Sequence, residues 1–367
     1  MIRLTWLQFR AQAVTAAAAL AAFAALLAAT GLHLASLYAA NGLSSCHAGS
    51  CQQLAENFIV QIAGTYTALY LISVAVILLA PAVIGLFWGA PLIARELETG
   101  TSPLAWNQSV TRTRWLAVKL TLIGLAAMAV TEALCLMQAW WAAPIGRASG
   151  DGAIGGPLTQ GRLTQLVFAT HGITPLGYAA FAFTLGVTAG ALIRRTIPAM
   201  AVTLAIFAAV QVVMPLWIRP HFAPPHRTAI SVASMGHLAG GPTGPGGSTF
   251  TRVATSLPGQ PGAWLLSSGP VNAAGQPVST TPAACASIAN TGGTNTGTSQ
   301  ATQSGSAPAT GPAAFLGCLG SHGIREAITY QPASRYWRFQ WTETAIYLAL
   351  ALALTGYCFR RINRRLS

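Results

Sequence analysis

The side chains best suited to specific polar contacts lie in one short segment between two long apolar runs. The segment holds two of the seven acidic residues of the 367-residue chain. Its candidate contact residues are Arg95, Glu96, Glu98, Gly100, Thr101, Arg112 and Arg114. Carboxylates beside guanidinium groups form charge-assisted hydrogen bonds, so the pattern predicts a docking surface for a partner. The alternative is that these charges only solvate the end of a helix.

The sequence lacks the common patterns for catalysis and for cofactor binding. It contains no His-Glu-x-x-His, no Gly-x-Ser-x-Gly and no Cys-x-x-Cys, which are signatures of zinc proteases, serine hydrolases and thiolate zinc sites. The glycine-rich run 241–247 lacks the Lys-Ser/Thr of a phosphate-binding loop. His221 and His226 flank a proline-rich turn, and we interpret them as surface histidines. We therefore expect no catalytic residue, metal or cofactor.

The elements that must position the charged segment are membrane-spanning helices. Charged residues make up only 7% of the chain, against about 25% in soluble domains, and a span needs about 20 apolar residues. The predicted spans are residues 13–38, 60–91, 116–143, 166–193, 198–218 and 342–359. The chain is therefore predicted to be an all-α polytopic membrane protein.

The first residues are expected to form a separate helix on the membrane surface. Within 1–12, the residues Leu4, Leu7 and Ala11 share a helical face with two arginines nearby, which is typical of an interfacial helix that lies flat before the chain turns inward. A cleaved signal peptide is the alternative. Residues 11–40 carry no formal charge, and this stretch exceeds the roughly 7–15 residues of a signal core.

Basic residues predict the orientation of the spans. Twelve of the twenty fall on one side when the N-terminus is placed inside: Arg3, Arg10, Arg95, Arg112, Arg114, Lys119, Arg194, Arg195, Arg360, Arg361, Arg364 and Arg365. Both termini are then cytoplasmic, and the basic clusters bind anionic lipid rather than nucleic acid. Residues 13–218 hold five spans with a cytoplasmic loop at 94–115, 219–340 form an extracytoplasmic domain, and 341–367 form the last span and a basic tail.

The cysteines are consistent with this orientation. Cys46 and Cys51 lie in the first outer loop, and Cys285 and Cys318 lie in the outer domain, where an oxidising compartment favours disulfides. A Cys285–Cys318 bridge would stabilise the domain by about 3–4 kcal/mol. The alternative is four unpaired thiols. The two remaining cysteines fall inside spans, where we expect buried thiols.

The outer domain, 219–340, differs in composition from the spans. Residues 279–312 are largely Ser, Thr, Ala, Gly, Asn and Pro, too few apolar groups to offset the entropy of ordering, so we expect this stretch to be mobile. Short strands are expected at 253–257 and 263–266. The domain is therefore predicted to be a small, loop-rich insertion.

Polar residues inside spans are costly and therefore informative. Glu132 and Gln138 lie in the third span and Gln211 in the fifth. They are candidates for the lining of a translocation path, and a buried hydrogen bond that fixes helix packing is the alternative. Glu343, beside Trp341 at the outer end of the last span, is expected to be partly solvated and to anchor the interface.

Two stretches resemble a known family. Residues 89–101 and 104–115, including Arg95-Glu96-Leu97-Glu98, and residues 330–343, including Tyr330-Gln331-Pro332-Ala333-Ser334-Arg335-Tyr336-Trp337, resemble permease subunits of type-2 ABC transporters from high-GC bacteria. The resemblance covers the first three spans and the last one, and it is weak across the outer domain.

The resemblance implies a fold and a function. Such permeases have an interfacial helix and six spans, pair as homo- or heterodimers in the bacterial plasma membrane, and rely on separate cytoplasmic ATPase subunits. Their loop between spans two and three contacts the ATPase, which would assign this role to Glu96 and Glu98. The expected function is the membrane subunit of an ATP-driven exporter, not an enzyme itself. The alternative is a non-transporting membrane sensor or assembly protein whose outer domain binds a ligand.

Overall fold

A computed structural model describes most of the chain. The described residues are 2–46, 51–98, 112–150, 156–232, 242–243, 249–250, 257, 260, 262–291 and 312–365. The chain divides into two compact units. The membrane unit comprises residues 1–222 and 336–367, and the insertion unit comprises residues 223–335.

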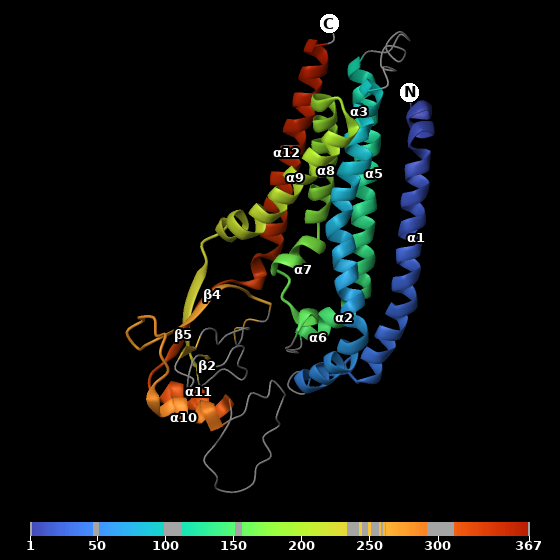
Figure 1. Ribbon diagram of the computed structural model, residues 1–367. Helices are drawn as coiled ribbons and strands as arrows, with labels where there is room; N and C mark the ends of the chain where they lie inside the picture. Colours follow the sequence, from blue (N-terminus) through green and yellow to red (C-terminus); the bar gives the residue numbers. More distant parts are fainter. Residues whose placement is uncertain are drawn as a thin grey trace. The chain divides into compact units, whose positions relative to one another are not determined.

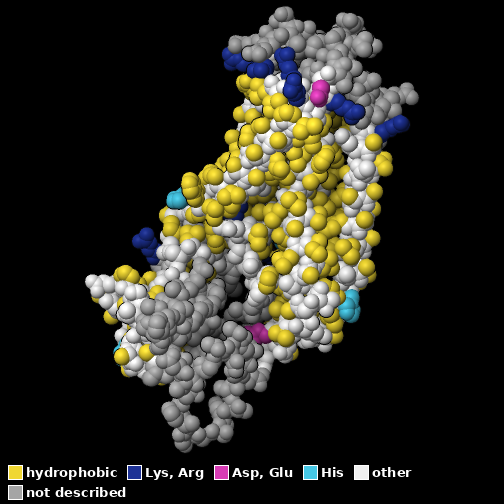
Figure 2. Space-filling view, viewed as in Figure 1, with side chains coloured by type: hydrophobic (Ala, Val, Ile, Leu, Met, Phe, Trp, Pro, Cys, Tyr) yellow, Lys and Arg dark blue, Asp and Glu magenta, His cyan; other side chains and the backbone are white. Residues whose placement is uncertain are grey.

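Six helices of the described residues are long and apolar enough to cross a bilayer. They are α1 (Ile2–Ala40), α2 (Cys51–Ile84), α5 (Arg112–Trp141), α8 (Thr174–Ile193), α9 (Thr196–Val213) and α12 (Tyr336–Arg365). The prediction of an all-α polytopic membrane protein with six spans is confirmed. The N-terminal end of α1 and the C-terminal end of α12 lie at the same end of the membrane unit (Figure 1). Apolar side chains cover their flanks, and basic side chains gather at that end (Figure 2).

Short helical elements extend or connect the spans. The π-helical turn η1 (Gly85–Gly89) joins α2 to α3 (Ala90–Glu98), and η3 (Met214–Ile218) and η4 (Arg219–His221) prolong α9. The connection between α5 and α8 contains α6 (Ala143–Gly150), η2 (Pro157–Thr159) and α7 (Gln165–Thr170). The residues that flank η1, Ile84 and Ala90, both have right-handed helical φ and ψ angles. Helices α2, η1 and α3 therefore form one continuous helical column.

The first helix differs from the expected arrangement. Residues 2–40 form a single helix, so no turn separates 1–12 from the first span. The stretch is alanine-rich and free of proline, which favours an unbroken helix. Phe9 is buried and packs edge-to-face on Trp88, with ring centroids 4.8 Å apart. The early residues of α1 are therefore held against η1.

The fourth span is shorter than expected. We expected it to begin near residue 166, but α8 begins at Thr174. Gly172 has a φ of 75°, a conformation that glycine adopts without strain, and Pro175 lies in the first turn of the new helix. These two residues end α7 and restart the helix as α8.

Helix α8 occupies the centre of the membrane unit. Within the window that qualifies it as a span, 78% of its residues are buried, against 6% for α1. It packs against α12, α3, α5, η1, α9 and α2. A displacement of α8 therefore affects nearly every other span.

Glycines allow the column α2–η1–α3 to approach α8 at backbone distance. A Cβ atom on Gly85 would lie 2.7 Å from the carbonyl oxygen of Ala182, and one on Gly190 would lie 2.5 Å from that of Ala90. A Cβ on Gly186 would meet backbone atoms of Gly85 and Ala90. Small residues at such crossings give the close contacts that hold membrane helices together. The column and α8 are thus packed without intervening side chains.

The insertion unit contains a three-stranded antiparallel sheet of order β1-β5-β4. Its strands are β1 (His226–Ser231), β4 (Trp264–Val271) and β5 (Arg325–Gln331), and a small pair is formed by β2 (Pro242–Thr243) and β3 (Thr249–Phe250). Two helices, α10 (Ala283–Thr291) and α11 (Pro312–Ser321), pack together beside Ile324 and Ile328. The turn η7 (Ala333–Arg335) ends the unit.

The expectations for this region are met in part. The strand expected at 263–266 corresponds to the start of β4, and the one expected at 253–257 lies almost entirely outside the described residues. Within the low-complexity stretch 279–312, residues 283–291 are helical, because Cys285 and Ile288 of α10 reach an apolar cluster with α11. Residues 292–311 lie outside the described residues.

The close contact at Gly186 predicts that adding a single methyl group there lowers the stability of the protein. Gly186→Ala should lower the free energy of unfolding by about 1–3 kcal/mol, because the new Cβ meets backbone rather than a movable side chain. Gly356→Ala on α12 is the matched control, since its Cβ would meet nothing within 4 Å, and helix propensity should make it neutral or stabilising. Thermal unfolding in detergent compares the two. Equal melting temperatures would show that the column and α8 can separate at little cost.

Candidate functional site

The predicted docking segment begins on α3. Ile93 and Ala94 are buried, whereas Arg95 and Glu98 are exposed. Helix α3 packs against α8 and α9. Its apolar side therefore fixes it to the membrane unit while its charged side faces outward.

Glu98 connects α3 to the start of α9. Its Oε2 atom accepts hydrogen bonds from the hydroxyl of Thr196 at 2.7 Å and from the Thr196 backbone N–H at 3.2 Å. A carboxylate at a helix N-terminus also benefits from the helix dipole. The hydroxyl bond, and then the backbone bond, lower the pKa of Glu98. Because the folded-state pKa is the lower one, the contribution of this contact is present at neutral pH and is lost as the pH falls through that value.

The other residues of the segment are described only in part. Arg95 and Arg114 are exposed at the ends of α3 and α5. Glu96 and Arg112 belong to these helices, but their side chains lie outside what the structure describes. Gly100 and Thr101 also lie outside the described residues.

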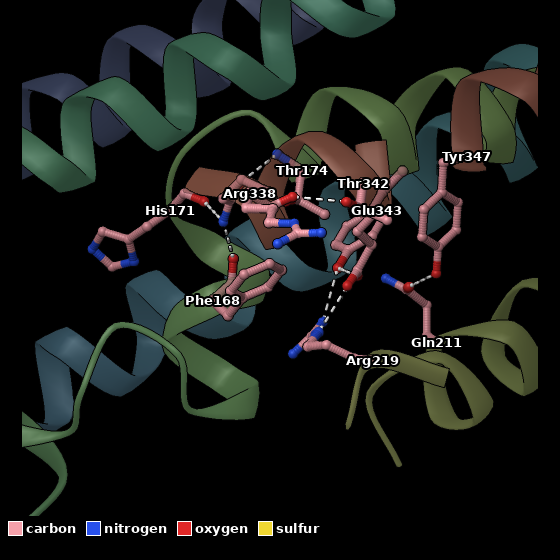
Figure 3. A network of polar contacts seen from close by, with 11 residues as sticks. Phe168, His171, Thr174, Gln211, Arg219, Arg338, Thr342, Glu343 and Tyr347 are labelled. Atoms are coloured by element: carbon pink, nitrogen blue, oxygen red, sulfur yellow. Dashed lines mark hydrogen bonds and ion pairs between the residues drawn. The ribbon is translucent and has the colours of Figure 1, made fainter. Parts of the chain in front are cut away.

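A second polar cluster is buried where α7, α8, α12 and η4 meet. Glu343 of α12 binds Arg219 of η4 in a bidentate ion pair, with Nε–Oε2 at 2.7 Å and Nη2–Oε1 at 2.9 Å. Tyr178 of α8 donates its hydroxyl proton to Glu343 Oε1 at 2.6 Å. The guanidinium lies over the ring of Phe168, 4.1 Å from its centroid. Figure 3 shows Arg219 and Glu343 facing one another, with Phe168 beside the guanidinium group.

The expectation for Glu343 was wrong. Its side chain is 0% exposed and its partner Arg219 is 1% exposed, whereas Trp341 is 64% exposed. Two residues along a helix correspond to about 200° of rotation, so Glu343 points inward where Trp341 points outward. Arg219 was not identified as a candidate from the sequence, although an arginine ending one span and a glutamate opening another on the same predicted side was an available signal.

Gln340 holds the corner between α7 and α8 to α12. Its Oε1 accepts from the backbone N–H groups of Ile173 at 3.0 Å and Thr174 at 2.9 Å. Its Nε2 donates to the carbonyl oxygens of Phe168 at 3.1 Å and His171 at 2.9 Å. The side chain thereby satisfies backbone groups that the helix break leaves open.

The three candidate lining residues have different surroundings. Gln211 of α9 accepts a hydrogen bond from Tyr347 of α12 at 2.9 Å, and this contact fixes helix packing. Gln138 of α5 is 0% exposed, and neither of its side-chain polar atoms has a hydrogen-bond partner among the described residues. Oε2 of Glu132 is likewise buried and unpartnered within that part of the chain. Gln138 and Glu132 thus differ from Gln211 in having buried polar atoms with no hydrogen-bond partner among the described residues.

Four cysteines form two disulfides. Cys46 is bonded to Cys51, and Cys285 to Cys318. The two other cysteines, Cys135 and Cys358, are free and buried in the membrane unit.

The buried ion pair predicts strong coupling between two substitutions. Glu343→Gln and Arg219→Met should each cost about 3–5 kcal/mol, because each leaves one member of a buried pair uncompensated. The double variant should cost much less than the sum, since it removes both charges of the pair together. Unfolding free energies of the four proteins give the coupling energy. Additive effects would mean that the two groups do not depend on one another.

Comparison with known proteins identifies the family. The family model described as "ABC-2 membrane transporter related" matches residues 17–219, more than half of the chain, from α1 to the arginine of the buried ion pair. Neither the curated proteins nor the solved structures provide a match. The match is consistent with the six spans and supports a multi-pass membrane transporter subunit rather than an enzyme. The chain belongs to the ABC-2 membrane transporter related family.

Proposed function

We propose that this chain is the permease subunit of an ATP-driven ABC exporter in the plasma membrane of a bacterium. Separate cytoplasmic ATPase subunits contact residues 94–115, and a second permease copy, identical or related, completes the transporter. Both termini are cytoplasmic, at the end of the membrane unit where basic side chains gather and can bind anionic lipid (Figure 2). Nucleic acid has no part in this function.

The observation that carries the proposal is the attachment of α3 on three sides. The helix continues α2 through η1, packs on α8 through glycine contacts, and is bonded to α9 through Glu98 and Thr196. A force applied to its exposed charged side therefore moves three spans together. This is what a coupling element requires, because ATP hydrolysis on one subunit must displace helices of another.

The buried ion pair extends this connection to the other end of the spans. Tyr178 lies on α8, Arg219 follows α9, and Glu343 lies on α12. If α3 displaces α8, the side chains of Tyr178, Arg219 and Glu343 must move together with it, or the buried charge pair must break. Breaking a buried charge pair is costly. The network therefore favours concerted movement of α8, α9 and α12.

Glu132 and Gln138 are the residues we propose for the translocation path. Their polar atoms have no partner among the described residues, which is costly inside a membrane unless a substrate or water reaches them during the cycle. Gln211 was a third candidate, but its bond to Tyr347 favours a packing role. Export is the direction usual for the family that the sequence resembles.

A variant series on α3 tests the coupling role. Glu96→Ala and Glu98→Ala should each reduce substrate-stimulated ATP hydrolysis in the reconstituted complex by about tenfold, if each removes a charge-assisted contact worth about 1.5 kcal/mol. Thr196→Val is the matched control, because it removes the hydroxyl partner of Glu98 and leaves every carboxylate in place. The ATPase rate and the amount of co-purified ATPase subunit are measured for each variant.

The comparison separates docking from packing. Loss of the ATPase in Glu96→Ala with retention in Thr196→Val supports docking through α3. If Thr196→Val reproduces Glu98→Ala, Glu98 acts through α9 instead of through the partner. Full coupling in Glu96→Ala/Glu98→Ala would refute the assignment of this surface to the ATPase.

A non-transporting sensor or assembly protein is the second candidate. The observation that favours it is that the insertion unit has an apolar cluster and a disulfide of its own, as a ligand-binding domain would need. A purified complex that lacks an ATPase partner and loses activity when residues 279–312 are deleted would favour this candidate. Co-purification of an ATPase would favour the exporter.

A further inference from the structure

The disulfide of the insertion unit has an ionisable neighbour. Nδ1 of His322 lies 3.8 Å from Sγ of Cys285, and Sγ of Cys285 is bonded to Cys318. The ligand atoms of these three residues all lie within 4.8 Å of one another. Three such groups could bind a metal ion after reduction, or they could support chemistry at the disulfide itself.

The hydrogen-bond pattern of His322 discriminates between these roles. Its Nδ1 lies 2.9 Å from the carbonyl oxygen of Cys318. A carbonyl oxygen only accepts hydrogen bonds, so Nδ1 must carry the hydrogen. A metal ligand needs a free lone pair on that nitrogen. The nitrogen nearest to Cys285 is therefore a proton donor and not a ready ligand.

The two sulfur atoms differ in accessibility. Cys285 is 0% exposed, in a cluster with Phe315 and Leu319. Cys318 is partly exposed. An external thiolate can therefore approach Cys318, and Cys285 is the sulfur that would depart. Burial disfavours a thiolate at Cys285 unless a donor stabilises it.

We propose that the Cys285–Cys318 disulfide is a thiol–disulfide exchange site whose substrate is an external thiol. The thiolate sulfur attacks Cys318 Sγ, a new S–S bond to Cys318 forms, and the Cys318–Cys285 bond breaks. The electron pair of the broken bond goes to Cys285. The protonated imidazole of His322 then gives its Nδ1 proton to the Cys285 thiolate. The exchange needs no further oxidant or reductant, because one disulfide replaces another.

The site would make the insertion unit responsive to thiols outside the membrane. Cys285 and Cys318 are separated by 33 positions in the sequence. Opening the bond therefore removes the covalent cross-link between α10 and α11. The exchange chemistry does not depend on the proposed transport function, since it concerns contacts within the insertion unit; only the location of the thiols rests on the proposed orientation.

Reaction of the full-length protein with reduced glutathione tests the proposal. Samples are quenched by alkylation, and the cysteine peptides are identified by mass spectrometry. We expect the glutathione adduct on Cys318. His322→Gln should slow opening of this disulfide by about tenfold or more at about pH 6, because a neutral amide cannot protonate the leaving thiolate. Rates are normalised to the concentration of glutathione thiolate.

Four controls distinguish proton donation from a structural role. The Cys46–Cys51 disulfide of the same molecules should open at an unchanged rate in His322→Gln. The difference between wild type and His322→Gln should be smaller at about pH 8.5 than at about pH 6, because general-acid catalysis weakens as the pH rises. His322→Lys should restore fast exchange. Ser321→Ala, which removes the hydroxyl 3.4 Å from His322 Nδ1, should behave as wild type.

Three results would overturn the proposal. They are an adduct on Cys285 in place of Cys318, equal rates for wild type and His322→Gln at both pH values, and a defect in His322→Gln that is independent of pH. Tight binding of Zn²⁺ alone to the reduced protein, lost in His322→Gln, would favour the metal site instead.

Discussion

Backbone contact between the column α2–η1–α3 and α8 is the constraint on which the membrane unit depends. Water is excluded from the hydrocarbon region, so the hydrophobic effect gives little drive for two apolar helices to meet there, and close packing must supply it. Gly85, Gly186 and Gly190 leave the two backbones room to touch. Since α8 is also the most buried span, its position determines where α9, α12 and α5 can lie.

Polar contacts join the ends of these packed helices to one another. Glu98 holds the end of α3 to the start of α9, and the pair of Arg219 and Glu343, with Tyr178, holds the other end of α9 to α12 and α8. The first contact is exposed, whereas the second is buried, so that loss of either partner of the buried pair leaves an uncompensated charge. An element of this kind is suited to accept a force at its exposed end and to respond as one body.

Sequence patterns predicted the spans well because apolar length is decisive in a bilayer. They could not predict that α1 continues through residues 2–12, since an amphipathic start is compatible both with a separate surface helix and with an extension of the first span. The contact of Phe9 with Trp88 favours the extension. Glu343 was misjudged because its pairing with Arg219 joins residues 124 positions apart. Glu98 was identified as important from its charge, but its bond to Thr196 was not, because no local pattern connects α3 with α9.

The most direct test of this account is a distance measurement between α3 and α8 during the ATPase cycle. Spin labels would be introduced at Arg95 and Leu192, both exposed. The labelled protein would be mixed with unlabelled copies and assembled with the proposed ATPase partner. A label at Trp341, at the other end of the spans, reports whether the complex has changed state. The account predicts that the separation of Arg95 and Leu192 is the same with and without a non-hydrolysable nucleotide, while the separation of the Trp341 labels in fully labelled complexes changes. A change between Arg95 and Leu192 would contradict it, because α3 would then slide over α8 instead of moving it.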